Sequence, residues 1–458
     1  MLLTTWLEIV ADWQGIFAQQ RSFRRAVRQA LGGLVCLGRR TLSRIIWTNG
    51  GEQRSWSAEY LLHARSAWKP QQLFAPILQR ALPDCPGPWI GVAVDDTRLR
   101  KTGLAIQQAF YQRDPLSPPF HWNLMRGLRF LQASLLVPLY RRSAVGARAL
   151  PIRFEEVSVV KRPRRQASEK EWKQYRAAVK LHNLSQRFAQ MMDHLRAAFD
   201  AAGAAAQTLV LAVDGSFCNR TVFGKVVRGV ELIARARKDI KLCFRAAPGS
   251  RRFYGTTKFT PEQVRQDDSI PWRTALIWYG GMRRPVEYKE VTGVYWQGGA
   301  RRRPLRLLVV RPTRYRKQNS GRFYYRQPAY LLTTVLKGSV APLLQIYFDR
   351  WQIEVNHREE KDTLGVGQAQ LWNVTSVPKQ PVLCVAAYSA LLLAALRAFG
   401  AERGAAYAPL PKWRRHAKRP SCLDLVTLLR KEMTENPDLL ADLDLKASDR
   451  AFTAAAAA

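Results

Sequence analysis

Two stretches of the chain are nearly continuous runs of apolar residues, a pattern typical of strands that are buried on both faces of a sheet. They are WIGVAVDDT, at residues 89–97, and TLVLAVDGSF, at residues 208–217. Both runs contain acidic residues near their ends, so we expect one buried strand to end at Asp95 and Asp96 and the other at Asp214. Residues 123–140 predict a further strand-rich stretch.

Helical spacing dominates other parts of the chain. Residues 1–85 alternate apolar and arginine-rich positions, and GRRTLSRIIWTNGG predicts a short helix capped by Thr41 and stopped at residues 49–51. Together with QRSFRRAVRQ it predicts either a helix-turn-helix-like unit that meets a DNA backbone or an ordinary helical bundle with a basic surface. Further on, Ser168 and Glu171 match a capping box, and we expect the helix that it opens to run to about Asp200.

Changes of composition divide the chain into five parts. A cluster of Pro and Gly at residues 83–88 marks the first boundary, and residues 238–338 change to short alternating strands with many Gly and Arg. The apolar run Val382 to Leu396 is short for a membrane span, so we expect a buried core helix that packs beneath the helix at 347–361. The predicted parts are a helical DNA-binding domain at 1–87, an α/β core at 88–237 and 339–400, a β-rich insertion at 238–338, and a basic helical region with an unstructured alanine tail at 401–458.

The charge balance indicates what kind of partner the protein binds. The chain has 73 Lys and Arg against 35 Asp and Glu, a formal net charge of +38. Such self-repulsion predicts a polyanionic partner, with nucleic acid as the first expectation. A membrane surface is not expected, because no basic amphipathic anchor is evident. The six cysteines are scattered, without metal-ligand spacing, and no secretory signal opens the chain, so we expect a cytoplasmic protein.

The segment YFDRWQIEVNHREEK, at residues 347–361, carries the most distinctive polar pattern. As a single helix it places Tyr347, Arg350, Glu354 and Lys361 within a stripe roughly 60° wide. A solvated charged face is the alternative interpretation. Trp351 is expected in the core.

Three acids follow one another in a recurrent order: Asp95 or Asp96 on one strand, Asp214 on a second, and Glu354 on a later helix. Clustered carboxylates repel one another unless divalent cations neutralise them, and Mg²⁺ prefers oxygen ligands. Two such ions can activate the attacking oxygen and stabilise the leaving oxygen of a phosphodiester displacement.

These motifs carry a family resemblance. The chain resembles bacterial insertion-sequence transposases of the DDE type, in the branch marked by Tyr-x2-Arg-x3-Glu-x6-Lys, whose four positions are Tyr347, Arg350, Glu354 and Lys361. The block DDTRLRKTG resembles the first-acid motif, which makes Asp95 the metal ligand and Asp96 its neighbour. LAVDGSF matches the second-acid strand. Further similar stretches are RARKDIKL, GVGQAQLWN and PKWRR.

The resemblance implies an RNase H-like catalytic core interrupted by a β-rich insertion, and a homodimer on double-stranded DNA. It implies cleavage at the terminal inverted repeats and joining to target DNA, with Asp95, Asp214 and Glu354 holding two Mg²⁺ ions, for which Mn²⁺ substitutes. It also implies that no nucleotide cofactor is needed. The DNA contacts expected are Tyr347, Arg350, Lys361, Arg358 and Lys101. Similar enzymes flip a base onto a tryptophan of the insertion, for which the candidates are Trp272, Trp278 and Trp296.

Two other functions stay open at this stage: a transposase-derived DNA-binding regulator, and a metal-dependent nuclease without strand transfer. The weaker signals carry ordinary interpretations. Gly365-Val-Gly367 predicts a helix stop, and neither His121 nor His357 is expected to bind metal. Arg301, Arg302 and Arg303 either follow DNA phosphates or belong to a solvated loop.

Overall fold

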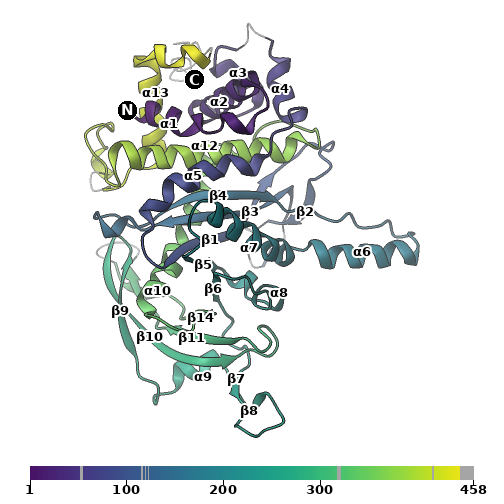
Figure 1. Cartoon of the computed structure of the whole chain (residues 1–458), viewed down its shortest axis with the longest axis vertical. Coiled ribbons are helices and arrows are strands. Elements are labelled where there is room, and N and C mark those ends of the chain that lie inside the picture. The colour runs from purple at the N-terminus through teal and green to yellow at the C-terminus, as the bar shows by residue number, and fades with distance from the viewer. Residues whose placement is uncertain are drawn as a thin grey trace.

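The computed structural model describes residues 1–51, 55–114, 117–118, 120–121, 123–316, 321–414 and 417–443. Within these residues the chain is a mixed α/β protein built on one large sheet (Figure 1). The predicted α/β class is therefore confirmed. The alanine tail at 444–458 lies outside the described residues, so the expectation for it stays a prediction.

Twelve strands in the described part of the chain belong to this sheet, whose main path runs β2-β3-β1-β5-β6-β14-β11-β10-β7-β8. The strand β4 pairs with β3 and β9 pairs with β10. Its first six strands are β1 (Trp89–Arg100), β2 (Phe110–Arg113), β3 (Leu124–Val137), β4 (Arg148–Glu156), β5 (Thr208–Val213) and β6 (Val230–Arg235). The pairs β1–β3 and β3–β4 are antiparallel, whereas β1–β5 and β5–β6 are parallel. Apolar runs thus become the central strands, as predicted.

One strand end differs from the prediction. β1 does not stop at its two acids but continues to Arg100, so Asp95 and Asp96 lie in mid-strand. The reason is that β1 has two neighbours of different length. β5 ends at Val213, whereas β3 stays paired with β1 as far as Arg100 opposite Gly127. Beyond Ala93 the described register therefore pairs β1 on one edge only.

The predicted helix from Ser168 to about Asp200 is two helices, α6 (Glu169–His182) and α7 (Leu184–Ala201). The capping box of Ser168 and Glu171 is confirmed. The break occurs at Asn183, which adopts an extended conformation and whose side chain accepts a hydrogen bond from the amide of Gln186. The Asn183 side chain caps the start of α7, and its extended backbone interrupts the helix that was predicted to continue. α7 packs on the sheet, but α6 buries none of its residues.

The strand-rich insertion joins the same sheet. Its described elements are β7 (Leu242–Arg245), β8 (Tyr254–Phe259), α9 (Pro261–Gln266), β9 (Arg273–Tyr279), β10 (Met282–Tyr295), β11 (Pro304–Val310), β12 (Arg314–Arg316), β13 (Phe323–Tyr325) and β14 (Ala329–Thr333). β14 pairs with β6 of the core, and β11 pairs with β14. A short helix, α8 (Arg220–Phe223), lies between β5 and β6.

The N-terminal helices and two C-terminal helices lie on one side of the sheet, where α5 and α12 contact β4 (Figure 1). The helices are α1 (Leu2–Ala11), α2 (Gln20–Val35), α3 (Leu42–Thr48), α4 (Ser57–Ala64), α5 (Phe74–Ala81), α12 (Ser376–Phe399) and α13 (Cys422–Glu435). The indole of Trp6 donates to the carbonyl of Ala387, and both carboxylate oxygens of Glu432 accept amides from Leu2 and Leu3. The boundary near residue 87 is thus a change of element type and not a break in the hydrophobic core.

The apolar helix α12 has the length and composition of a membrane span, but 72% of its most apolar window is buried inside the protein. Its contacts are with α1, α2 and β4 above all. The predicted buried core helix is confirmed. It touches the helix that carries Glu354 through Tyr388, whose hydroxyl lies within reach of Asn356 and Glu359.

Candidate functional site

The first two acids meet where β5 ends. The parallel register pairs Ala93 of β1 with Ala212 of β5, and two further residues on each strand bring Asp95 and Asp214 alongside one another. Asp214 begins a short turn, in which its carboxylate accepts hydrogen bonds from the amide and hydroxyl of Ser216 at 2.9 and 2.6 Å. On its other side Asp95 faces Gln132 of β3. Both carboxylates therefore lie where β5 ends and β1 continues without it.

The helix α11 (Trp351–Arg358) is fixed on the sheet by an apolar contact and a polar one. Ile353 is fully buried in a small cluster with Ala93, Leu136 and Ala149, so it lies over the residue two positions before Asp95. Asn356 accepts a hydrogen bond from the Ser134 hydroxyl at 3.1 Å. Its amide nitrogen donates to the carbonyl of Ala149 and to the Tyr388 hydroxyl. These contacts determine where the intervening Glu354 is placed.

Arg350 lies between two of the acids. It follows α10 (Val340–Asp349), and its guanidinium donates to Glu354 Oε1 from Nη2 at 3.1 Å, while Nη1 is 3.9 Å from Asp95 Oδ2. Its Nε and Nη1 atoms are buried without a hydrogen-bond partner among the described residues. Arg350 therefore offsets the negative charge of the acids and still has donors for an anion such as a phosphate.

Electrostatic effects link all three carboxyl groups. Burial and, to a lesser extent, the charge of Asp214 raise the pKa of Asp95 to about 7, against the opposing charge of Arg350. Burial also raises the pKa of Glu354, again against Arg350 and with Asp214 adding to the shift. The charge of Asp214 acts on both Asp95 and Glu354, and Arg350 contacts both, so the three acids lie in one neighbourhood.

The donor chemistry of this place fits a hard cation, but the present side-chain arrangement is not a ready metal site. Carboxylate oxygens are the ligands that Mg²⁺ prefers. Within the described residues, however, no three His, Cys, Asp or Glu side chains are grouped closely enough to hold an ion. Arg350 supplies the positive charge between Asp95 and Glu354 instead. A metal could be held by the three acids only after Glu354 releases Arg350.

The prediction of one regular helix over residues 347–361 is wrong. The segment is α10, then α11, then a π-helical turn at Glu359–Thr363. The turn buries Glu359, which accepts from the Tyr388 hydroxyl, and Glu360, which lies beside Gln132. Because this turn is wider than 3.6 residues, the stripe calculated for a regular helix does not hold as far as Lys361. The helical stretch stops at Gly365, whose φ of +56° confirms the predicted helix stop.

Tyr347 and Lys361 nevertheless lie near the acids. Burial raises the pKa of Tyr347, on which the charges of Arg350, Asp214 and Glu354 also act. Burial lowers the pKa of Lys361, while the charge of Asp95 raises it. Two helices and a π turn carry the four signature positions, and the charges of the acids act on Tyr347 and on Lys361.

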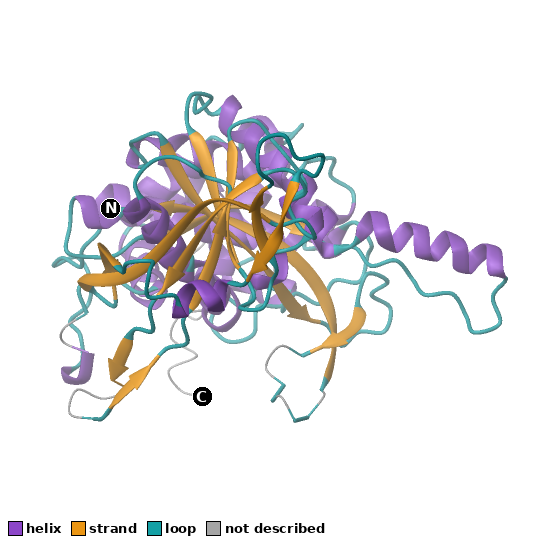
Figure 2. Cartoon of the chain, turned by 90° about the horizontal axis from the view of Figure 1, so that it is seen from below, coloured by secondary structure: helices purple, strands orange, loops and turns teal. Residues whose placement is uncertain are grey.

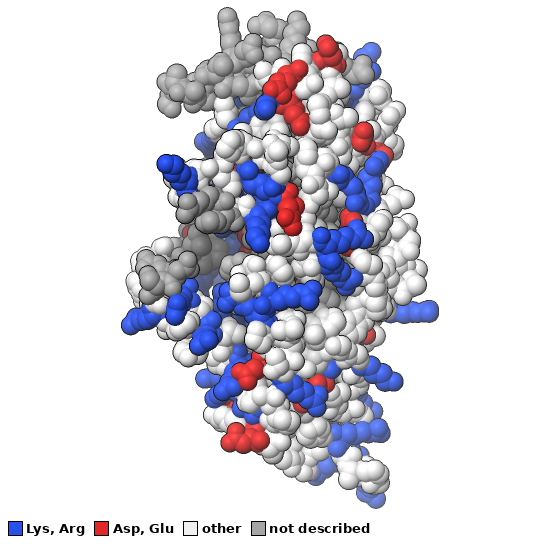
Figure 3. Space-filling view, turned by 90° about the vertical axis from the view of Figure 1, so that its left-hand side faces the viewer, with Lys and Arg blue, Asp and Glu red and all other residues white. Residues whose placement is uncertain are grey.

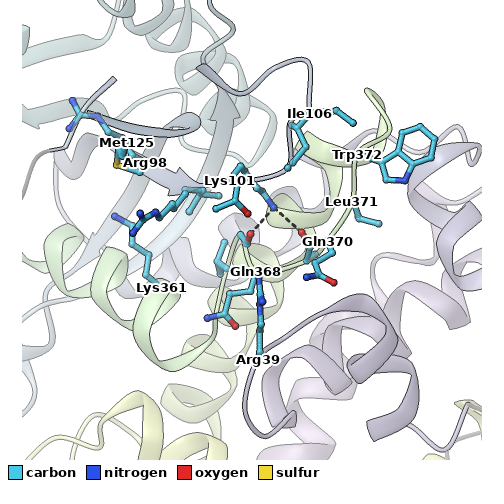
Figure 4. A pocket seen from close by; sticks show the side chains of 18 of the residues that line it. Arg39, Arg98, Lys101, Ile106, Met125, Lys361, Gln368, Gln370, Leu371 and Trp372 are labelled. Carbon is cyan, nitrogen blue, oxygen red and sulfur yellow. Dashed lines mark hydrogen bonds between the residues drawn. The ribbon is translucent and has the colours of Figure 1, made fainter. Parts of the chain in front are cut away.

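Lys361 also lines an adjoining pocket of about 840 Å³ (Figure 4). Four other cations line it: Arg39, Arg98, Arg100 and Lys101. The ammonium of Lys101 donates to the carbonyls of Gly367 and Ala369 at 2.6 and 2.9 Å, and the residue is only 7% exposed. Lys101 therefore holds the loop that contains Gly367 and Ala369 in place, and the expectation that it contacts DNA stays a prediction. Trp372, which sequence reasoning missed, is 69% exposed at the rim.

Other candidates have diverse surroundings. Trp351 is 59% exposed, which corrects the expectation of a core position, because Ile353, Asn356 and His357 form the buried side of α11. Arg358 is exposed, as a DNA contact requires. Burial lowers the pKa of His357 to about 3, and His121 is exposed.

The insertion candidates are mostly engaged within the fold. The Trp272 ring is 4.8 Å from the Lys289 ammonium, Trp278 stacks 6.4 Å from Tyr140, and Trp296 meets Phe223 edge to face at 5.9 Å. Arg303 pairs with Glu231 at 2.9 Å, whereas Arg301 and Arg302 are exposed. Each of the three tryptophans is partly buried, so none presents a fully exposed ring to a flipped base.

No protein-family model matches the chain, and no curated protein matches its sequence.

The buried amide of Asn356 gives a first prediction. Asn356→Ala removes three hydrogen bonds that fix α11, so we expect a loss of about 1–3 kcal/mol in the free energy of unfolding. Urea denaturation measures the loss. Arg358→Ala, at an exposed position of the same helix, is the matched control and should change stability by less than about 0.5 kcal/mol. Equal effects of the two substitutions would show that Asn356 does not anchor the helix.

Asp349 gives a prediction about pH. Burial raises its pKa from 3.8 to about 7, so its charging in the folded protein opposes stability increasingly as pH rises from about 4 to 7. Asn keeps the bond from Gln345, which is 2.9 Å from the carboxylate, and never charges. We expect the stability advantage of Asp349→Asn over the wild type to grow by about 3 kcal/mol between pH 5 and pH 8. A difference that stays constant across this range would contradict the raised pKa.

Proposed function

We propose that the chain is a DNA transposase of the DDE type, which cuts transposon ends and joins them to target DNA. The observation that supports the proposal is that Asp95 lies beside the strand that ends at Asp214, while the Arg350 guanidinium lies between Asp95 and Glu354. The order β4-β3-β1-β5-β6, antiparallel in its first three strands and parallel in the rest, supports an RNase H-like core. The strand-rich segment between Asp214 and Glu354 supports the interrupted form of that core.

The side chains divide the work between acids and cations. Asp95, Asp214 and Glu354 would hold the Mg²⁺ pair, which supplies an activated oxygen nucleophile and charge stabilisation for the leaving oxygen when bound. Once Glu354 releases it, Arg350 would orient a phosphate through its guanidinium, and Lys361 would attract the neighbouring phosphate from the pocket side. Tyr347 offers a protonated hydroxyl, since burial raises its pKa.

Charge supports duplex DNA as the partner. The formal net charge is +38, and Lys and Arg spread over the face in Figure 3 with few acids among them. Phosphate contacts of this kind are independent of sequence and steer association. The N-terminal helices, including α2 and α3, supply a basic surface for end recognition. Pairing of two ends by a homodimer, and action on chromosomal DNA in the cytoplasm, complete the proposal.

One observation favours a second candidate, a DNA-binding regulator that does not cut. Arg350 already neutralises Asp95 and Glu354, so the three acids can coexist without a metal. Such a protein would use the same fold to occupy DNA ends. Metal binding separates the two functions.

Metal binding can be measured without any reaction. We expect Mg²⁺ at millimolar concentration to raise the melting temperature of the wild type, because ligands that bind only the folded state stabilise it. Asp214→Asn, which removes one carboxylate charge, should abolish this shift. Asp193→Asn is the control, since Asp193 pairs with Lys225 away from the acids, and it should preserve the shift. A wild type indifferent to Mg²⁺ and Mn²⁺ would favour the regulator.

Cleavage tests the enzymatic proposal. On a supercoiled plasmid carrying the element's own ends, Asp214→Asn and Glu354→Gln should each lower Mg²⁺-dependent cleavage by more than about 100-fold, because loss of even an outer partner of a metal ligand costs about 10–100-fold. End binding, measured by gel shift, should change little. Full cleavage by either variant removes that residue from the active site. Nicking of the ends without any joining to target DNA would identify a nuclease.

A further inference from the structure

The helix α6 and the loop before it form a basic arm, defined here as residues 161–182. The arm contains eight Lys or Arg residues and two Glu residues, a formal net charge of +6. Figures 1 and 2 show α6 extending away from the sheet beyond α7. None of its 14 residues is buried.

Contacts within the fold do not account for this helix. Helices of this length are marginal in water on their own and usually gain stability by packing an apolar face. Here the capping box of Ser168 and Glu171 supports the first turn, where Ser168 Oγ and its amide both meet Glu171 Oε2 at 2.8 Å. The chain thus maintains a projecting helix that serves no core, which points to a partner outside it.

The two sides of α6 differ in chemistry. At about 100° per residue, Trp172, Tyr175 and Val179 share one stripe roughly 60° wide. The Trp172 and Tyr175 rings meet edge to face at 5.9 Å, and the Arg162 guanidinium lies 5.4 Å from the Trp172 ring centre. The apolar stripe is therefore partly covered by the arm's own loop.

The cations of α6 occupy a separate stripe. Lys170, Lys173, Arg176 and Lys180 fall within a stripe roughly 120° wide, whose centre lies about 130° around the helix from that of the aromatic stripe. All four are exposed, and none forms an ion pair with a described acid. They extend over about 15 Å of helix, at 1.5 Å per residue. Backbone phosphates of DNA follow each other closely enough for several of these cations to meet one each.

We propose that the basic arm binds the phosphate backbone of duplex DNA at a distance from Asp95, Asp214 and Glu354. The inference rests on the proposed function, in which the substrate is DNA, and adds a contact surface to it. Four unpaired cations on one stripe favour a polyanion, whereas the partly covered aromatic stripe leaves less apolar surface for a protein partner. Lys and Arg at phosphates fix position and carry no sequence information, so the arm binds any sequence.

The test is the salt dependence of binding to a fluorescein-labelled 40-base-pair duplex of mixed sequence. Anisotropy titrations from 50 to 200 mM KCl give the slope of log affinity against log salt. In the variant that combines Lys170→Gln, Lys173→Gln, Arg176→Gln and Lys180→Gln, we expect the magnitude of the slope to fall by about 2–4, at about 0.9 for each lost phosphate contact. Glutamine preserves the helix, because its helix propensity is close to that of Lys and Arg.

A charge-conserving variant is the matched control. It combines Lys170→Arg, Lys173→Arg, Arg176→Lys and Lys180→Arg, and it should keep the wild-type slope. If the glutamine variant also keeps that slope while the wild type binds the duplex, the arm proposal is overturned and the proposed function stands. If the glutamine variant instead loses self-association by light scattering at an unchanged slope, the arm binds a second copy and the proposal is likewise overturned. Failure of the wild type to bind any duplex would overturn the proposed function itself.

Discussion

The site depends on how α11 is held against the sheet. Ile353 packs over Ala93 of β1, and one turn later Asn356 bonds to β3, to the backbone of β4 and to Tyr388 of α12. These two residues fix the rotation and height of the helix, and Glu354 lies between them. Without this docking, the strand acids would face solvent alone. The N-terminal helices contribute indirectly, since they bury the other side of α12.

A second constraint is electrostatic. Three carboxyl groups lie near one another in a partly buried region. The raised pKa values of Asp95 and Glu354 show that their charged forms are disfavoured there. Arg350 offsets part of this unfavourable effect in the present structure. A pair of divalent cations would offset it more completely and free the guanidinium for a phosphate. The proposed enzyme thus exchanges one positive charge for others at the same acids, and Glu354 is the group that changes partner.

Sequence patterns predicted the elements that depend on residues close together in the chain. Apolar runs gave β1, β3 and β5, the Ser168 and Glu171 pair gave the start of α6, and the apolar stretch at 382–396 gave the buried helix α12. Asp214 at the end of its strand and Glu354 on its helix followed from strand ends and from the family resemblance. The break at Asn183 was visible in principle, because asparagine before a helical run is a capping signal.

Features set by partners distant in sequence could not be predicted in this way. β1 continues past Asp96 because β3 pairs with it there, and the π turn at Glu359–Thr363 brings two glutamates toward Tyr388 and Gln132. The ammonium of Lys101 bonds two carbonyls of a loop more than 260 residues later, a contact that no local pattern indicates. Trp351 is exposed because three other residues take the buried side of α11.

The most direct test of the metal site is the anomalous scattering of Mn²⁺ in crystals of the wild-type protein. The account predicts ion peaks bound by Asp95 and Asp214, with Glu354 turned from Arg350 toward them. A structure at saturating Mn²⁺ in which Glu354 stays on Arg350 and no ion lies between the acids would contradict it.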